Sequence, residues 1–332
     1  MSQTAFVFPG QGSQEPGMGA PWAHTPSWTL VDRASRVSGR DVAELLLHAD
    51  ADTLRRTDNA QLATFVLACV AHAEVRAALP DVRPVAVAGH SLGEYTALVA
   101  SGALGYEDGV RLVAARGEAM REACAAAPGT MGVVLGLDVD EVRALADRLR
   151  VREGADVWVA NLNSPQQAVL SGAPEGVARC GEAALAEGAT RVVDIPVGGA
   201  FHSPLMEPAR PRLAEALAGT AFRPAHAPVV ANVDGRAHDD PDRWPDLMLD
   251  QLTSPVLWLD TVRTLTGDLG ADLLVELGPG RVLTGFAKRI TRGAARASVA
   301  VPDQIPALAE AVGATSEDEA PARVRVASGV AP

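Results

Sequence analysis

Cysteine is scarce in this sequence, and the few that are present are scattered. The three cysteines, Cys69, Cys124 and Cys180, lie far apart in alanine-rich stretches of the 332-residue chain. Disulfide frameworks and zinc sites need cysteines, or cysteines and histidines, clustered at short spacings. The seven histidines show no metal-ligand spacing either. The sequence therefore predicts no metal site and three small, reduced side chains, as expected in the cytoplasm.

The sequence has fewer basic than acidic residues. Lysine and arginine number 29 against 41 aspartate and glutamate residues, so the formal net charge is −12. Nucleic-acid binders derive much of their affinity from lysine and arginine on phosphates, and basic segments attach proteins to anionic membranes. We therefore expect neither nucleic acid nor a membrane surface as a partner.

Long apolar runs are also missing. No run reaches the ~20 residues of a membrane-spanning helix, and the first residues lack the basic region and apolar core of a signal peptide. Apolar residues make up 48% and charged residues 21% of the chain. This composition is typical of a soluble protein with one large domain or two moderate ones. We expect a cytoplasmic monomer.

The most informative stretch is RPVAVAGHSLGEYTALVASG, residues 83–102. Residues 84–88 form an apolar run that fits a buried strand, and residues 94–100 have the composition of a helix start. Between them lies a G-x-S-x-G motif centred on Ser91. Strand, tight turn and helix together indicate a nucleophile elbow, which exposes the serine Oγ at a helix N-terminus. An ordinary glycine turn is the alternative.

A serine nucleophile needs a base within hydrogen-bond reach. His90 is adjacent, but neighbouring side chains on an elbow point apart, so we interpret it as structural. His202 follows Gly-Gly-Ala-Phe, precedes Ser-Pro, and lies after Ser91 in the chain, which is the order of hydrolases. It is the candidate base. The group that orients it stays open, because Asp194 and a backbone carbonyl are both possible acceptors.

Two further polar side chains have less certain roles. Gln11 lies in a glycine-rich loop after the apolar run 4–8, and such a loop is also typical of an ordinary strand exit. Arg116 falls at the edge of the apolar stripe of a predicted helix over residues 106–124, with no acid at i±3 or i±4. Either it reaches water or it binds a ligand carboxylate.

The pattern of predicted elements indicates an α/β fold. Residues 130–196 read as β-α-β-β-α-β, the split βαβ order of a ferredoxin-like unit, with residues 161–165 as the turn between its middle strands. We expect a hydrolase-like large domain with a parallel-sheet core and this unit inserted as a small subdomain. The predicted division is a large domain at residues 1–127 and 198–305, an insert at 128–197, and a partly disordered C-terminal tail at 306–332.

Eight short motifs follow one another along the chain: FPGQGSQ (8–14), GHSLGEY (89–95), RGEAM (116–120), ANLNSP (160–165), GAFHS (199–203), NVDG (232–235), QLTSPV (251–256) and ELGPG (276–280). Together they resemble the malonyl-CoA:acyl carrier protein transacylases and the related acyltransferase domains of polyketide synthases. The resemblance extends to about Val301 and implies the two-part α/β fold described above.

The resemblance implies transfer of a malonyl group from malonyl-CoA to the phosphopantetheine thiol of an acyl carrier protein, for fatty-acid or polyketide synthesis. The reaction would be ping-pong, through an ester on Ser91 that forms with His202 as base. Gln11 and the backbone N–H of Leu92 would stabilise the oxyanion. The main-chain carbonyl of Gln251 would orient the histidine. No cofactor is implied, since malonyl-CoA is a substrate.

The resemblance also assigns substrate contacts. Arg116 would pair with the free carboxylate of malonate through two parallel hydrogen bonds. Met120, Phe201, Asn161 and Asn163 would complete the substrate site. Phe201 before the histidine is similar to the malonyl-selective version of the motif, although a single methyl group is a weak basis for discrimination.

Two other functions share these residues. A thioesterase or editing hydrolase would use the same Ser91 and His202, and a non-catalytic carrier-protein scaffold would need neither. The basic run at residues 288–296 either meets an acidic carrier protein or is an ordinary solvated surface.

Overall fold

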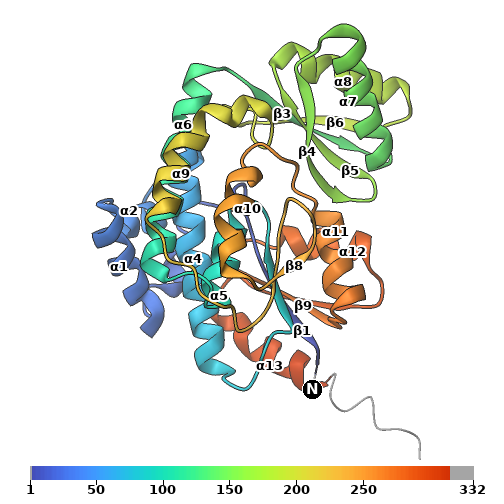
Figure 1. Cartoon of the computed structure of the whole chain (residues 1–332). Coiled ribbons are helices and arrows are strands. Elements are labelled where there is room, and N and C mark those ends of the chain that lie inside the picture. Colours follow the sequence, from blue (N-terminus) through green and yellow to red (C-terminus); the bar gives the residue numbers. More distant parts are fainter. Residues whose placement is uncertain (1, 315–332) are drawn as a thin grey trace, which may run out of the picture.

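The computed structural model describes residues 2–314, which fold around two β-sheets (Figure 1). The large sheet has the strand order β10-β9-β1-β2-β7-β8, and all neighbours are parallel except the β7–β8 pair. Its strands are β1 Thr4–Phe8, β2 Ala86–Gly89, β7 Val229–Val230, β8 Ala237–His238, β9 Leu273–Leu277 and β10 Ala295–Val299. The chain is thus α/β with a parallel-sheet core, as the sequence predicts.

Helices cover both faces of the large sheet, so its central strands are apolar on both sides. Phe6 and Phe8 enter a core with α4, α5 and α6, whereas Ala5 and Val7 face α11 and α12. The helices of this part are α1 Thr29–Ser38, α2 Val42–Leu47, α3 Ala51–Arg55, α4 Thr57–Ala78, α5 Gly93–Ala100, α6 Tyr106–Ala126, α9 Arg210–Ala218, α10 Trp244–Gln251, α11 Trp258–Arg263, α12 Val282–Ile290 and α13 Ile305–Ala314. Shorter 3₁₀ turns lie at Ala20–Trp22, Pro26–Trp28, Pro204–Ala209, Pro241–Arg243 and Pro302–Gln304, with a π-helical turn at Thr264–Asp268.

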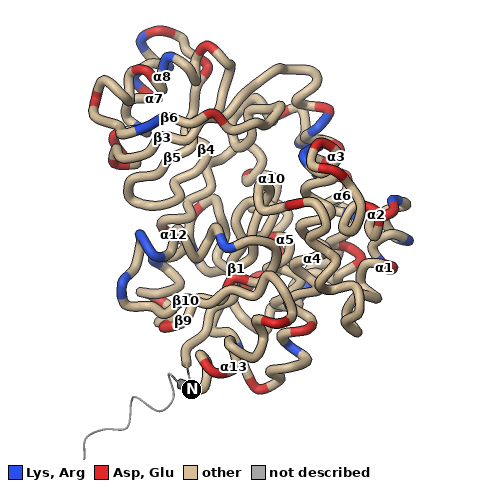
Figure 2. The backbone as a smooth tube through the Cα atoms, turned by 180° about the vertical axis from the view of Figure 1, so that it is seen from behind, with Lys and Arg blue, Asp and Glu red and all other residues tan. Residues whose placement is uncertain are grey.

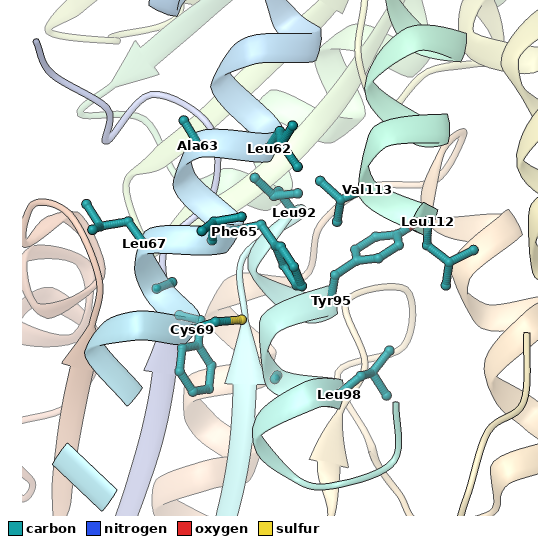
Figure 3. Packing of buried hydrophobic residues seen from close by; sticks show 14 of the residues in the cluster. Leu62, Ala63, Phe65, Leu67, Cys69, Leu92, Tyr95, Leu98, Leu112 and Val113 are labelled. Atoms are coloured by element: carbon teal, nitrogen blue, oxygen red, sulfur yellow. The ribbon is translucent and has the colours of Figure 1, made fainter. Parts of the chain in front are cut away.

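Apolar side chains of α4 pack against α5 and α6. Figure 3 shows Phe65 of α4 beside Leu92 and Tyr95 at the start of α5, with Val113 of α6 completing the contact. All four side chains are fully buried. This packing holds the first turn of α5, which carries the serine motif, against two long helices.

The second sheet is antiparallel, with the order β4-β5-β3-β6. Its elements are β3 Thr130–Leu135, α7 Val139–Glu153, β4 Val157–Ser164, β5 Gln167–Gly172, α8 Pro174–Ala186 and β6 Arg191–Ile195. Alternate residues of β5 face opposite ways: Leu170 packs with α7 and α8, and Val169 joins the core of the large body. One face of this sheet therefore rests on the rest of the molecule (Figure 1).

Some predicted boundaries were wrong. The turn predicted at residues 161–165 is strand as far as Ser164, and only residues 165 and 166 turn. Asparagine favours turns, but here a neighbouring segment supplies ladder partners, because Leu162 N donates to Val256 O and Val256 N donates to Ala160 O. α3 and β10 were not predicted. Of the predicted tail, residues 306–314 belong to α13, and residues 315–332 lie outside the described residues.

The residues that the structure describes contain no helix long and apolar enough to cross a membrane.

The close approach of β1 and α5 gives a test of the fold. A Cβ on Gly93 would lie 2.1 Å from the carbonyl oxygen of Phe8, whereas a Cβ on Gly285 in α12 would meet nothing within 4 Å. We expect Gly93→Ala to lower the free energy of unfolding by about 1–3 kcal/mol, as overpacking does. Gly285→Ala should be neutral or stabilising by up to ~1 kcal/mol, because alanine favours the helix. Urea denaturation of both variants measures this, and equal stability of the two would contradict the packing described.

Candidate active site

Ser91 lies in a strained turn between β2 and α5. Its φ is +51°, and among the non-glycine residues of the described chain only His202, at +56°, shares a positive φ. Such backbone persists only when its surroundings hold it. Here Ser91 N donates to Asn232 Oδ1 at 2.6 Å, and Ser91 O accepts from Gln251 Nε2 at 3.0 Å. The turn is thus fixed from both sides by distant parts of the chain.

The structure brings Ser91 and His202 together. Ser91 Oγ lies 2.7 Å from His202 Nε2, and His202 Nδ1 lies 2.8 Å from the main-chain oxygen of Gln251. A carbonyl oxygen can only accept, so Nδ1 carries the proton and Nε2 is free to accept the serine proton. Asp194, by contrast, is exposed on β6. The acceptor at His202 Nδ1 is therefore a backbone carbonyl.

His202 is held in its neutral form. Burial and the positive charge of Arg116 lower the pKa of His202 to about 3. At neutral pH the imidazole is unprotonated, which is the state that a general base needs. The ring can take a proton only while charge develops at the serine.

Arg116 on α6 is a buried cation that forms no ion pair with any described residue, although the Glu94 carboxyl is close enough to interact with it electrostatically. Its side chain is 1% exposed, Nη1 donates to Gln61 Oε1 at 2.7 Å, and Nη2 donates to Ser91 Oγ at 3.1 Å and Gln251 Oε1 at 3.0 Å. These acceptors are uncharged, Nε has no partner, and the guanidinium carbon lies 5.4 Å from the ring centre of Tyr95.

The sequence left open whether the Arg116 side chain reaches water. It is buried and does not reach water. Burial lowers the pKa of its guanidinium, but arginine stays protonated in proteins. A buried charge without an ion pair is costly, and an anion bound beside Arg116 would lower that cost.

A cavity of about 370 Å³ opens over Ser91, between the large body and the second sheet. Met131 of β3, Asn161 of β4 and Ile195 of β6 contribute to it from the second sheet. The remaining lining residues come from the large body or its connections: Gln11, Gly12, Gln14, Arg55, Gln61, His90, Ser91, Arg116, Met120, Pro196, Val197, Phe201 and His202. A small acyl group fits this space, with polar groups beside the serine and apolar side chains around it.

Of the other predicted residues, four line the cavity: Gln11, Met120, Phe201 and Asn161. Leu92 is buried at the start of α5, and no acceptor for its N–H is found among the described residues.

Asn163 does not line the cavity. Its Oδ1 lies 2.8 Å from His90 Nε2, and His90 packs against Trp258 with ring centres 5.5 Å apart. In the free protein Asn163 thus contacts His90, and its contact with substrate stays a prediction. His90 itself lines the cavity while filling the structural role expected of it.

Three residues of the site were missed from the sequence: Gln61, Asn232 and Glu94. Gln61 is fully buried in α4 and joins Arg116 to Met120, whose Sδ lies 3.3 Å from Gln61 Nε2. The signal that could have identified it is a glutamine directly before the mostly apolar stretch 62–71. Asn232 and Glu94 lie inside short motifs, but nothing local shows that both reach Ser91.

Within residues 2–314 no group of histidine, cysteine and acidic side chains could hold a metal ion.

Comparison with known proteins gives a consistent result. The acyl transferase domain family matches residues 5–317. The malonyl CoA-acyl carrier protein transacylase of Bacillus subtilis (strain 168) is 38% identical over 309 residues, covering 92% of this chain and 96% of that protein. The corresponding protein of Escherichia coli (strain K12) is 40% identical over 294 residues, 87% and 93% of the two chains.

A solved structure agrees with these sequence relatives. It is a type II PKS acyl-carrier protein in complex with its malonyl-transacylase, and it matches with a TM-score of 0.88 at 36% identity, over 93% of this chain and 100% of that one. With Ser91, His202 and Arg116 meeting in one cavity, the chain belongs to the malonyl-CoA:acyl carrier protein transacylase family of acyltransferases.

Proposed function

We propose that this protein transfers a malonyl group from malonyl-CoA to the phosphopantetheine thiol of an acyl carrier protein, as a cytoplasmic monomer and without a cofactor. The product would enter fatty-acid or polyketide synthesis. The observation that carries the proposal is the buried Arg116, which forms no ion pair with any described residue and shares a cavity with the Ser91–His202 pair. The names of the relatives support the same reaction.

In the first half-reaction Ser91 Oγ attacks the thioester carbonyl of malonyl-CoA while its proton passes to His202 Nε2. The carbonyl of Gln251, 2.8 Å from Nδ1, stabilises the imidazolium that forms. The oxyanion accepts hydrogen bonds from the Leu92 N–H and from Gln11. Collapse of the tetrahedral intermediate breaks the C–S bond, and the CoA sulfur leaves with the proton from His202.

The second half-reaction repeats these steps with the carrier-protein thiol. The thiol gives its proton to His202 and attacks the malonyl ester, and the proton then returns to Ser91 Oγ as the C–O bond breaks. The second half-reaction is the reverse of the first with a different thiol, so a single Ser91–His202 pair serves both half-reactions.

Arg116 binds the carboxylate at the far end of the acyl group. In the free protein Nη2 donates to Ser91 Oγ at 3.1 Å. Once that oxygen belongs to an ester it is a weaker acceptor, and the guanidinium is free for a bidentate pair with malonate. Met120 and Phe201 lie around the short carbon chain, and Asn161 adds a polar contact. A hydrolase would need no such cation.

The second sheet gives the cavity its other wall. We propose that residues 128–197 form a ferredoxin-like subdomain inserted into a hydrolase-like large domain. The strand order β4-β5-β3-β6, with α7 and α8 as the two crossing helices, supports this description.

A basic surface on and after α12 is the proposed docking site for the carrier protein. Its exposed members are Arg281, Lys288, Arg289, Arg292 and Arg296, and within the described chain none of them forms an ion pair. Figure 2 shows basic positions in blue beside the α12 label. Phe286 of α12 packs on His90, with ring centres 6.3 Å apart, so this surface adjoins the cavity. An acidic carrier would be steered there by charge.

The acyl intermediate can be detected by intact-mass measurement after mixing with a panel of acyl-CoAs. We expect malonyl-CoA to add one malonyl group, and Ser91→Ala to remain unmodified. Carrier protein should discharge the adduct much faster than water does. Loss to water at the same rate with and without carrier would show that the protein is a hydrolase, and the absence of any adduct would exclude both enzymes.

Removing the guanidinium tests the clamp. Arg116→Ala should lower kcat/KM for malonyl-CoA by roughly 100-fold, because a buried charge pair typically contributes several kcal/mol. The relative rate with acetyl-CoA should rise, since that acyl group has no carboxylate. Arg111→Ala on the same helix is the matched control, because Arg111 is exposed and paired with Asp108. Unchanged malonyl kinetics in Arg116→Ala would refute the clamp.

Charge reversal tests the docking surface. Arg289→Glu and Arg292→Glu should each raise KM for the carrier protein several-fold, in line with the loss of electrostatic steering, and leave KM for malonyl-CoA unchanged. Arg83→Glu is the control, because Arg83 is also exposed but precedes β2, at the end of the strand away from Ser91. If the KM for the carrier protein is the same in Arg289→Glu, Arg292→Glu and Arg83→Glu, the carrier protein docks on another surface.

A further inference from the structure

Glu94 is a fully buried carboxyl group that the reaction described above does not use. It lies in the first turn of α5, three residues after Ser91, with 0% exposure. Its Oε2 accepts from Gln251 Nε2 at 2.6 Å and from the main-chain N of Asn232 at 3.2 Å, whereas Oε1 has no partner among the described residues. Burial raises the pKa of Glu94 to about 8. With or without a proton on Oε1, Oε2 remains an acceptor for both N–H donors.

The two residues that Glu94 holds are the residues that fix the serine turn. Asn232 accepts from Ser91 N at 2.6 Å and donates from Nδ2 to Gly89 O at 2.7 Å. Gln251 donates from the same Nε2 to Ser91 O at 3.0 Å. Both residues are more than a hundred positions from Glu94 in the chain, at separations of 138 and 157. One carboxyl group therefore joins the turn to the two distant segments that hold its left-handed serine.

Gln251 also contacts the other two groups of the site. Its main-chain oxygen accepts from His202 Nδ1, and its side-chain Oε1 accepts from Arg116 Nη2. The amide has two hydrogens, and both are taken by oxygen atoms, those of Glu94 and Ser91. The amide oxygen must then face the guanidinium. A reversed amide would place oxygen against the Glu94 carboxyl and N–H groups against Arg116, so Glu94 fixes the orientation.

We propose that Glu94 is a positioning residue: through Gln251 and Asn232 it holds the Ser91 backbone, the His202 ring and the Arg116 guanidinium in one arrangement. This role deepens the proposed function and rests on it for the identity of the acyl donor. The network itself does not depend on which acyl group is transferred.

Two substitutions separate the hydrogen-bonding role from a merely structural one. Glu94→Ala removes the acceptor, and we expect the rate of Ser91 acylation by malonyl-CoA to fall about 100-fold, as for a displaced reacting group, with KM changed little. Glu94→Gln keeps an oxygen for Gln251 and Asn232 and should restore most of the rate. Thr96→Val is the matched control, since Thr96 is equally buried on α5 and its hydroxyl has no partner. It should acylate at the wild-type rate.

The outcomes that overturn the proposal are distinct. A folded Glu94→Ala variant that acylates at the wild-type rate would refute it, even if its melting temperature is lower. Glu94→Gln as slow as Glu94→Ala would also refute it, because charge rather than hydrogen bonding would then matter. Should Glu94→Ala not fold, Glu94→Asp takes its place, because the shorter side chain withdraws the acceptor, and it is expected to be slow while Glu94→Gln is fast.

A second readout keeps this test independent of the acyl donor. A fluorophosphonate probe labels a serine that is activated by a neighbouring base, whatever the natural substrate. Labelling of Ser91 should slow in Glu94→Ala and recover in Glu94→Gln. If the wild type forms no malonyl adduct but shows this labelling pattern, the proposed function fails and the role of Glu94 stands. Equal labelling of all variants overturns the role of Glu94.

Discussion

The hydrogen bond between Ser91 Oγ and His202 Nε2 is the interaction on which the rest of the site depends. It joins the two non-glycine residues of the described chain that have left-handed backbone. Strain of this kind costs about 1–3 kcal/mol per residue, so neither conformation would persist unaided. Gln251 supports both, with its side-chain N–H on the serine carbonyl and its main-chain carbonyl on the histidine ring. A single residue at the C-terminal end of α10 thus holds the nucleophile and the base in position.

The sequence predicts the elements with strong local signals. β1 coincides with the mostly apolar run at residues 4–8, which proline and glycine follow. The motif around Ser91 and the position of Arg116 on its helix were sufficient to nominate both residues. The continuation of β4 as far as Ser164 could not be predicted, because Val256, which pairs with this part of the strand, is distant in the chain.

Site contacts made by backbone groups, or between residues distant in the chain, could not be predicted from the sequence either. A carbonyl that orients a histidine has no residue type to mark it, so Gln251 entered only through a family resemblance. Asn163 is a related case, since its hydrogen bond to His90 comes from a residue 73 positions away and could not be predicted from the shared motif. Local pattern therefore identifies reacting side chains, whereas the contacts that position them follow from the tertiary structure.

Arg116 and His202 are coupled by charge, and this coupling extends the role of the substrate carboxylate. The uncompensated guanidinium lowers the pKa of His202, second only to burial. A malonate carboxylate paired with Arg116 would cancel much of that field, and the imidazolium that forms during attack would then be less costly. A neutral acyl group would leave the cation uncompensated beside a base that must become positive. Selection for a diacid therefore acts on the barrier to proton transfer as well as on binding, and interactions that matter only as charge develops are those that raise kcat.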